Sequence, residues 1–115
     1  MSKTSPTQRT LKLCRDAGWT VQVVEKWNSF ARVRVDLFGF IDLVAMNGAS
    51  IIGIQSTSGA NVSKRMDKIK ENPKSAEWLR SGGRLFVHGW RKLKSSGKWE
   101  CREIEVTLET LQAMN

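Results

Sequence analysis

The sequence predicts an α/β protein with a mixed central β-sheet flanked by helices. The first observation is the order of the predicted elements, which is helix, three strands, helix, strand and strand. The second is a pair of largely apolar segments, 37–45 and 50–57, as expected for strands buried on both faces of a sheet. The third is the dipeptide Asn47-Gly48 between them, which is typical of a tight hairpin turn.

The 115 residues are expected to form one domain, 1–115, around a single hydrophobic core. No apolar run approaches membrane-spanning length, and the first residues lack the apolar segment of a secretory signal. Cys14 and Cys101 lie far apart without a Cys-x-x-Cys pattern, which favours reduced thiols over a disulfide or a zinc site. We therefore expect a cytoplasmic protein that does not associate with membranes.

The first helix is predicted to begin at Ser5, which can cap it, with Pro6 in its first turn and Gln8 at the capping-box spacing. Gly18 is expected to end this helix. The segment 19–27 is rich in Val and Trp and predicts the first strand.

A long second strand is predicted over 31–46, with Gly39 marking a bend or bulge within it. The third strand is predicted over 50–57, and Asn61 is expected to cap a helix over 62–71. The rest of the chain is predicted to form a short helix, two strands and a final helical turn, over 75–81, 84–90, 99–107 and 108–115.

The positive charge is concentrated in one part of the chain. The formal net charge is +8, and segment 62–102 holds twelve Lys and Arg against four Asp and Glu, whereas the rest carries seven of each sign. Such an excess, interleaved with aromatic residues, predicts contact with the phosphate backbone of nucleic acid. A solvated basic surface, or one that binds an acidic protein, is the alternative. The interleaved rings are Trp78, His88, Trp90 and Trp99, and the predicted contacts are Lys64, Arg65, Lys68, Arg91, Lys92, Lys94 and Lys98.

Two polar residues lie on the predicted central strands, Asp42 within the second and Gln55 near the end of the third. Burying a carboxylate without a partner costs much free energy, so Asp42 needs a metal, a cation or several donors. A carboxylate and an amide oxygen on adjacent strands can supply two ligands to Mg²⁺ or Mn²⁺. The alternative is a structural carboxylate that is bonded to backbone donors or to an arginine.

These features resemble the PD-(D/E)xK nuclease superfamily, whose restriction-endonuclease-like core has the order αβββαβ. Residues 39–44, Gly-Phe-Ile-Asp-Leu-Val, match its Gly-x-x-Asp portion, and residues 52–57, Ile-Gly-Ile-Gln-Ser-Thr, occupy its (D/E/Q)-x-K portion. The chain is more narrowly similar to small phage-type or Holliday-junction-resolvase-like members that have Gln in place of the acidic residue. The resemblance covers most of the chain and implies a Mg²⁺- or Mn²⁺-dependent endonuclease acting on DNA, including branched DNA, with Asp42 and Gln55 as metal ligands. It also implies a homodimer and a phage origin.

One position departs from the family pattern, because Thr57 stands where the family normally has lysine. A threonine hydroxyl can orient a water or bind a phosphate oxygen, but it carries no positive charge. Lys64 is the first candidate to supply that charge, with Arg65 and Lys68 behind it. The predicted catalytic set is Asp42, Gln55, Thr57 and Lys64. The alternative is a chain that has kept the fold, lost cleavage and become a nucleic-acid-binding module.

Two more carboxylates are candidates for the site. Asp36 lies six residues before Asp42, with the same strand parity, and is predicted as a third metal ligand if no bulge intervenes. Glu25, near the end of the first strand, is a further candidate, and either residue can instead be a surface charge. His88, the only histidine, has no partner at a recognisable spacing and is expected to pack or to contact phosphate rather than act as a base.

Overall fold

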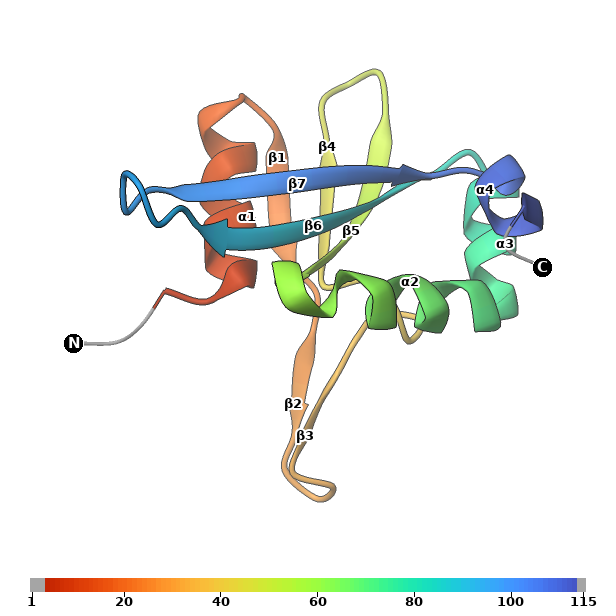
Figure 1. The fold of residues 1–115 in the computed structure, drawn as a ribbon. Helices are drawn as coiled ribbons and strands as arrows, with labels where there is room; N and C mark the ends of the chain where they lie inside the picture. Colours follow the sequence, from red (N-terminus) through yellow and green to blue (C-terminus); the bar gives the residue numbers. More distant parts are fainter. Residues whose placement is uncertain (1–3, 114–115) are drawn as a thin grey trace.

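In the computed structural model, residues 4–113 form a five-stranded sheet with helices on both faces (Figure 1). The strands lie in the order β1 (Thr20–Val23), β4 (Leu43–Met46), β5 (Ile51–Ser58), β6 (Arg84–Lys92) and β7 (Trp99–Val106). Strands β5 and β6 are parallel, and the other neighbouring strands are antiparallel. The remaining elements are α1 (Pro6–Asp16), β2 (Lys26–Asn28), β3 (Val33–Val35), the short 3₁₀ helix η1 (Gly59–Asn61), α2 (Val62–Glu71), α3 (Pro73–Arg80) and α4 (Leu108–Ala113). The predicted mixed α/β fold is confirmed at this level.

Two hydrophobic cores fill the two faces of the sheet, because successive side chains of a strand point to opposite sides. Ile52 and Ile54 of β5 pack with Leu11 and Cys14 of α1 on one face. The other core contains Leu85 and Val87 of β6, and Val62 and Ile69 of α2 also belong to it. The sheet is therefore covered by α1 on one side and by the later helices on the other.

Several local predictions are confirmed. The Ser5 hydroxyl accepts a hydrogen bond from the Gln8 backbone N–H at 3.2 Å, so α1 begins where its capping residues predicted. The Asn47 side chain accepts the N–H groups of Ala49 and Ser50, both at 2.9 Å, in the predicted turn between β4 and β5. Both cysteines are free thiols. Within residues 4–113, no helix is long and apolar enough to cross a membrane.

The prediction of one long strand over 31–46 is wrong, because the chain leaves the extended conformation between β3 and β4. Leu37 and Ile41 exchange backbone hydrogen bonds of 2.8 and 3.0 Å across a tight loop. Within the loop, Phe38 and Gly39 have φ values of +56° and +89°. Phe40 and Ile41 are both fully buried. Successive side chains of a strand point to opposite faces, so a strand with one face in solvent would expose one of the two. The loop thus replaces the middle of the predicted strand and reverses the chain before Asp42.

Other boundaries also differ from the prediction. The first predicted strand, 19–27, is divided between β1 in the main sheet and β2 in a separate two-stranded hairpin with β3. Figure 1 shows this hairpin projecting away from the sheet. Asn61 makes no side-chain cap to α2, since the short helix η1 leads directly into it. Residues 114–115 of the predicted final helical turn lie outside the described residues.

The prediction of an exposed aromatic contact is wrong for Trp90, which is buried against α1, whereas the packing alternative is confirmed for His88, which is buried there too. The Trp90 indole donates to the Thr10 hydroxyl at 2.9 Å. That hydroxyl also lies 2.9 Å from Ser56 Oγ and 3.1 Å from His88 Nδ1. His88 Nε2 lies 2.8 Å from a carboxylate oxygen of Glu103. Burial lowers the pKa of His88, against the opposing effect of Glu103, and a neutral ring then accepts from Thr10 and donates to Glu103.

We expect Thr10→Val to lower the free energy of unfolding by about 2–3 kcal/mol, because the isosteric change leaves the buried donors and acceptors around it without a partner. Thr10 is fully buried and serves three side chains, so no water replaces its hydroxyl without a rearrangement. Urea denaturation measures the change. Thr20→Val, at an exposed position of β1, is the matched control and is expected to change stability by less than about 0.5 kcal/mol. Equal stability of the two variants would contradict the role assigned to this network.

Candidate metal centre

Asp42 lies immediately before β4 rather than inside a strand. Its carboxylate accepts a backbone hydrogen bond from β5 that a paired strand would otherwise accept. Its backbone N–H donates to the Ile54 carbonyl at 2.9 Å, which fixes it beside β5. The pairing of β4 with β5 ends at Leu43 opposite Ile54. The next N–H of β5 that points toward β4 therefore has no backbone partner on that side. Asp42 Oδ2 accepts that N–H, from Ser56, at 2.8 Å. The carboxylate is therefore held in place by the sheet, with 3% of the residue exposed.

Gln55 lies next to Asp42, as the sequence predicted. Its Nε2 donates to Asp42 Oδ2 at 2.7 Å, and no arginine contacts the Asp42 carboxylate in the hydrogen bonds of the described residues. The Gln55 Oε1 atom is buried and has no hydrogen-bond partner among the described residues. An unsatisfied buried acceptor costs about 1–3 kcal/mol. The nitrogen of this amide faces the carboxylates of Asp42 and Asp36, so its oxygen would meet a cation held among them only after the side-chain amide rotates.

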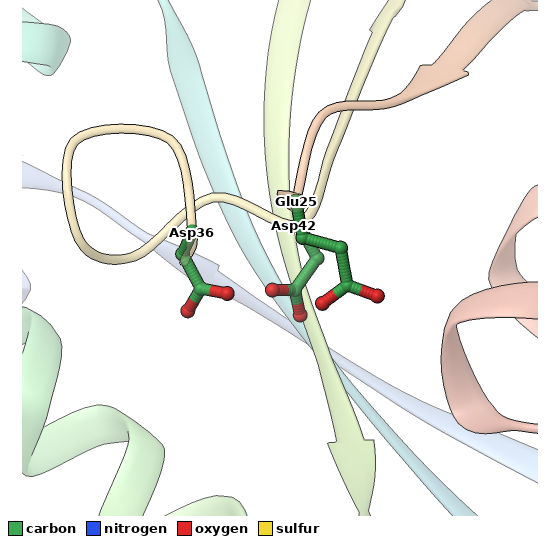
Figure 2. Close-up of side chains that lie close together, drawn as sticks. All are labelled: Glu25, Asp36 and Asp42. Carbon is green, nitrogen blue, oxygen red and sulfur yellow. The ribbon is translucent and has the colours of Figure 1, made fainter. Parts of the chain in front are cut away.

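Glu25 and Asp36 complete an acidic cluster with Asp42. One carboxylate oxygen from each lies within 4.8 Å of the other two. Figure 2 shows the three groups close together, with Asp36 and Asp42 at the two ends of one loop and Glu25 on the segment that follows β1. The N–H groups of Val24 and Glu25 donate to the Asp42 carbonyl at 2.8 and 3.2 Å, which ties the start of the β2–β3 hairpin to the cluster. Asp36 joins through the loop before β4, not through the strand parity that predicted it.

Two basic side chains partly balance this cluster. Arg34 Nη1 lies 3.1 Å from Glu25 Oε1, and Lys68 Nζ lies 2.9 Å from Asp36 Oδ2. The two acidic side chains of these pairs are each only 10% exposed. Three carboxylates thus face two cations, so one negative charge remains without compensation when all three are ionised. A charge left in such a site is expensive, because burial removes its hydration.

Burial and the neighbouring charges shift the pKa values of Asp42 and Asp36 in opposite directions. Burial, together with the hydrogen bond to Asp36 and its negative charge, raises the pKa of Asp42 to about 8. Burial would also raise the pKa of Asp36, but its hydrogen bonds with Asp42 and Lys68 outweigh burial and hold it below its ordinary value. Asp42 therefore keeps the shared proton near neutral pH, and an added cation would compete with that proton.

The structure brings Lys68, rather than the first candidate Lys64, into contact with the acidic cluster. Lys64 and Arg65 lie one turn earlier on α2, where they line a small polar pocket of about 320 Å³ together with Asn61 and Lys68. Thr57 is buried on β5 and shares the face of Gln55, two residues away. Of the three basic candidates on α2, Lys68 is the one with an ion pair to the acidic cluster among the described residues.

The other predicted nucleic-acid contacts lie elsewhere on the molecule. They are exposed at the end of β6 and in the loop to β7, and comprise Arg91, Lys92, Lys94 and Lys98. Figure 1 shows this loop at the end of the two strands that is opposite to α3 and α4. Arg91 is paired with Glu100 at 3.2 Å. Of the predicted aromatic contacts, Trp99 is exposed, with the Arg9 guanidinium 3.8 Å above its ring, whereas Trp78 packs against the main chain of Gly83.

Two residues of the acidic cluster and its ion pairs, Glu25 and Lys68, were only secondary candidates from the sequence. The sequence leaves Glu25 as either a ligand or a surface charge, and the structure places it in the acidic cluster, where its backbone N–H bonds to the Asp42 carbonyl. Lys68 was placed behind Lys64, although the helical spacing of four puts both on one side of α2. Lys68 rather than Lys64 contacts the cluster because the loop before Asp42 brings Asp36 next to Lys68. The path of this loop produces no periodic pattern in the sequence.

Comparison of the chain with protein-family models, with curated proteins and with solved structures found no match. Inference about its function therefore depends on the chemistry of the acidic cluster and on the sequence motifs.

Proposed function

We propose that the protein is a metal-dependent endonuclease that hydrolyses phosphodiester bonds in DNA, with Mg²⁺ or Mn²⁺ as its cofactor. One observation carries the proposal: three largely buried carboxylates lie together with two paired basic side chains among the described residues, beside a buried amide oxygen that has no partner there. A divalent cation would supply the missing positive charge, and rotation of the Gln55 amide would let it also bind the unpartnered oxygen. Oxygen donors of this kind are the ligands that Mg²⁺ and Mn²⁺ prefer.

The order of the elements supports membership of the PD-(D/E)xK superfamily. Helix α1 is followed by three antiparallel strands of the main sheet, β1, β4 and β5, then by α2 and a strand parallel to β5. With the β2–β3 hairpin and α3 taken as additions, this order agrees with the αβββαβ order that the resemblance of residues 39–44 and 52–57 implies. Those motifs place Asp42 and Gln55 on neighbouring segments, and the two side chains are in contact.

The residues that would hold the metal are Asp42, Asp36 and Gln55, with Glu25 beside them. When bound, the metal supplies Lewis-acid stabilisation of the negative charge that develops on the phosphate. The Ser56 N–H and the Gln55 amide orient the Asp42 carboxylate, which limits the reorganisation needed in the reaction. Lys68 contributes a positive charge at the edge of this site, next to Asp36.

The decisive assay incubates the purified protein with linear duplex, single-stranded and four-way-junction DNA in Mg²⁺, in Mn²⁺ and in EDTA. We expect cleavage in the two metals and none in EDTA. Calorimetric titration with Mn²⁺ in the absence of DNA is a second measurement. It is informative because the proposed metal ligands are all protein side chains, so the metal is expected to bind without DNA. An absence of both cleavage and Mn²⁺ binding would overturn the proposal.

Lys68→Met is expected to reduce the cleavage rate roughly 10- to 100-fold, because it removes a cation placed where charge develops. Lys64→Met is the matched control on the same helix and is expected to change the rate by less than about threefold, since its contribution is to a screened surface field. Initial rates at saturating Mn²⁺ distinguish the two variants. A larger loss in Lys64→Met than in Lys68→Met would show that the assignment is reversed.

A second candidate function is a nucleic-acid-binding module on the same fold, without cleavage. The observation that favours it is Thr57, an uncharged side chain at the family's lysine position. This alternative predicts salt-dependent DNA binding without products in any metal, and binding that Asp42→Asn leaves unchanged or strengthens.

A further inference from the structure

The β2–β3 hairpin carries an unusual concentration of exposed apolar side chains. Among the described residues, nine large hydrophobic side chains are exposed, and five of them fall between positions 27 and 38. These five are Trp27, Phe30, Val33, Val35 and Phe38. Contiguous exposed apolar groups on a soluble domain mark binding surfaces. Figure 1 shows the hairpin standing clear of the sheet, so a partner can reach it from several sides.

The tip of the hairpin presents Phe30 to solvent in an ordered turn. Phe30 has the full exposure of an isolated side chain, 101%. The Asn28 side chain accepts the N–H groups of Phe30 and Ala31 at 3.0 and 3.1 Å, and Arg32 adopts a left-handed φ of +54°. Side-chain and backbone interactions, not apolar packing, hold the turn. The exposed ring therefore contributes no apolar burial to the stability of the fold, as expected for a side chain that contacts a partner.

The charges of the hairpin favour a polyanion as that partner. Lys26 and Arg32 are exposed, and Arg34 is the cation paired with Glu25. The acidic residues at the base of the hairpin, Glu25 and Asp36, are committed to the acidic cluster. Two copies of the hairpin facing each other would bring like charges together, which opposes self-association. Aromatic rings between basic side chains suit stacking on nucleic-acid bases beside a phosphate backbone.

The hairpin also lies next to the proposed metal centre. A groove of about 570 Å³ runs along its base, and Trp27, Val35 and Asp36 are among the residues that line it. Asp36 thus belongs both to this groove and to the acidic cluster. Phe30 and Asp36 are six positions apart, so the chain between them spans at most about 20 Å when extended, which is the length of about six stacked nucleotides.

We propose that the β2–β3 hairpin is a base-contacting arm that stacks Phe30 and Trp27 on unpaired bases within about six nucleotides of the bound phosphate. The substrate class that this favours is DNA with unpaired or unstacked bases, such as gaps, flaps and branch points, over continuous duplex. The choice of ligand rests on the proposed function. The arm itself is assigned from its exposed rings, its charge and its position.

Phe30→Ala tests the arm on a duplex with a gap of about six nucleotides, which matches the estimated reach. The gap carries 2-aminopurine, a fluorescent base analogue, and binding is measured by anisotropy in EDTA so that no cleavage intervenes. We expect the variant to bind gapped DNA about tenfold more weakly and to lose the change in 2-aminopurine emission. Its binding to the fully paired duplex is expected to change less than about twofold. Met46→Ala, an exposed apolar change on β4, is the control and is expected to match the wild type.

The outcomes separate this inference from the proposed function. Unchanged gapped-DNA affinity and emission in Phe30→Ala would overturn the arm, even for a protein that cleaves DNA. Equal losses on gapped and paired DNA would also overturn it, because they indicate contact with the backbone alone. Sedimentation that showed a wild-type dimer and a monomeric Phe30→Ala variant would assign the hairpin to self-association instead. A protein that shows the predicted binding difference but no cleavage would retain the arm and lose the nuclease.

Discussion

Asp42→Asn is expected to reduce metal-dependent DNA cleavage about 1,000-fold or more while the protein keeps its fold. The carboxylate is the central member of the acidic cluster, so its loss removes a charged metal ligand. Loss of about 4 kcal/mol of transition-state stabilisation corresponds to a rate decrease of about 1,000-fold. The fold is expected to survive because Asn still accepts the Ser56 N–H, and the wild-type residue already holds a proton near neutral pH.

The control for this variant is Asp67→Asn, the same chemical change at an exposed position of α2. It is expected to cleave at the wild-type rate, because it lies outside the acidic cluster. Initial cleavage rates and calorimetric Mn²⁺ titrations are measured on all three proteins, with circular dichroism to verify folding. Cleavage by a folded Asp42→Asn protein at more than about a tenth of the wild-type rate would place the metal elsewhere.

Without divalent metal, the free energy of unfolding is expected to fall by roughly 5 kcal/mol as the pH rises from about 4 to about 8. The pKa of Asp42 is raised from 3.8 to about 8 in the folded protein, mainly by burial and by Asp36. Across this window the folded chain holds a proton that the unfolded chain has released, so rising pH favours unfolding. Asp36 has a lowered pKa and acts in the opposite direction only below its ordinary value.

The other groups near Asp42 are Glu25, Arg34 and Lys68, and His88, whose pKa is lowered by burial, lies on the opposite face of the sheet. Comparison with Asp42→Asn removes their contributions, because both proteins contain them. Urea denaturation in EDTA at several pH values is expected to show a flatter profile for Asp42→Asn. Saturating Mn²⁺ at pH 8 is expected to restore stability to the wild type only, by binding the folded state. Parallel profiles for the two proteins would contradict the raised pKa.

The local elements were predictable because their signals lie within a few residues. The Ser5 cap of α1 and the Asn47-Gly48 turn each depend on one or two side chains that bond to nearby backbone. The contact of Asp42 with Gln55 followed from a short hairpin, since antiparallel neighbours joined by a tight turn have little freedom in register.

The predicted exposure of Trp90 was wrong, because the sequence does not show which side of a strand is covered. His88 and Trp90 lie at alternate positions of β6, and both face α1, where Thr10 satisfies their polar atoms. The same pattern of rings and basic residues would suit an exposed strand. Only the packing of α1 on the sheet decides that these two side chains are buried.

By itself, the sequence determined that the chain is an α/β domain in which a buried carboxylate meets an amide from the next strand. Only the tertiary structure decided that Glu25, Asp36 and Lys68 join them. The left-handed turn at Phe38 and Gly39 reverses the chain and places Asp36 against α2, and backbone bonds to the Asp42 carbonyl bring in Glu25. Residues that are distant in sequence meet here because burying Phe40 and Ile41 outweighs the alternation of an extended strand, and no local pattern encodes that balance.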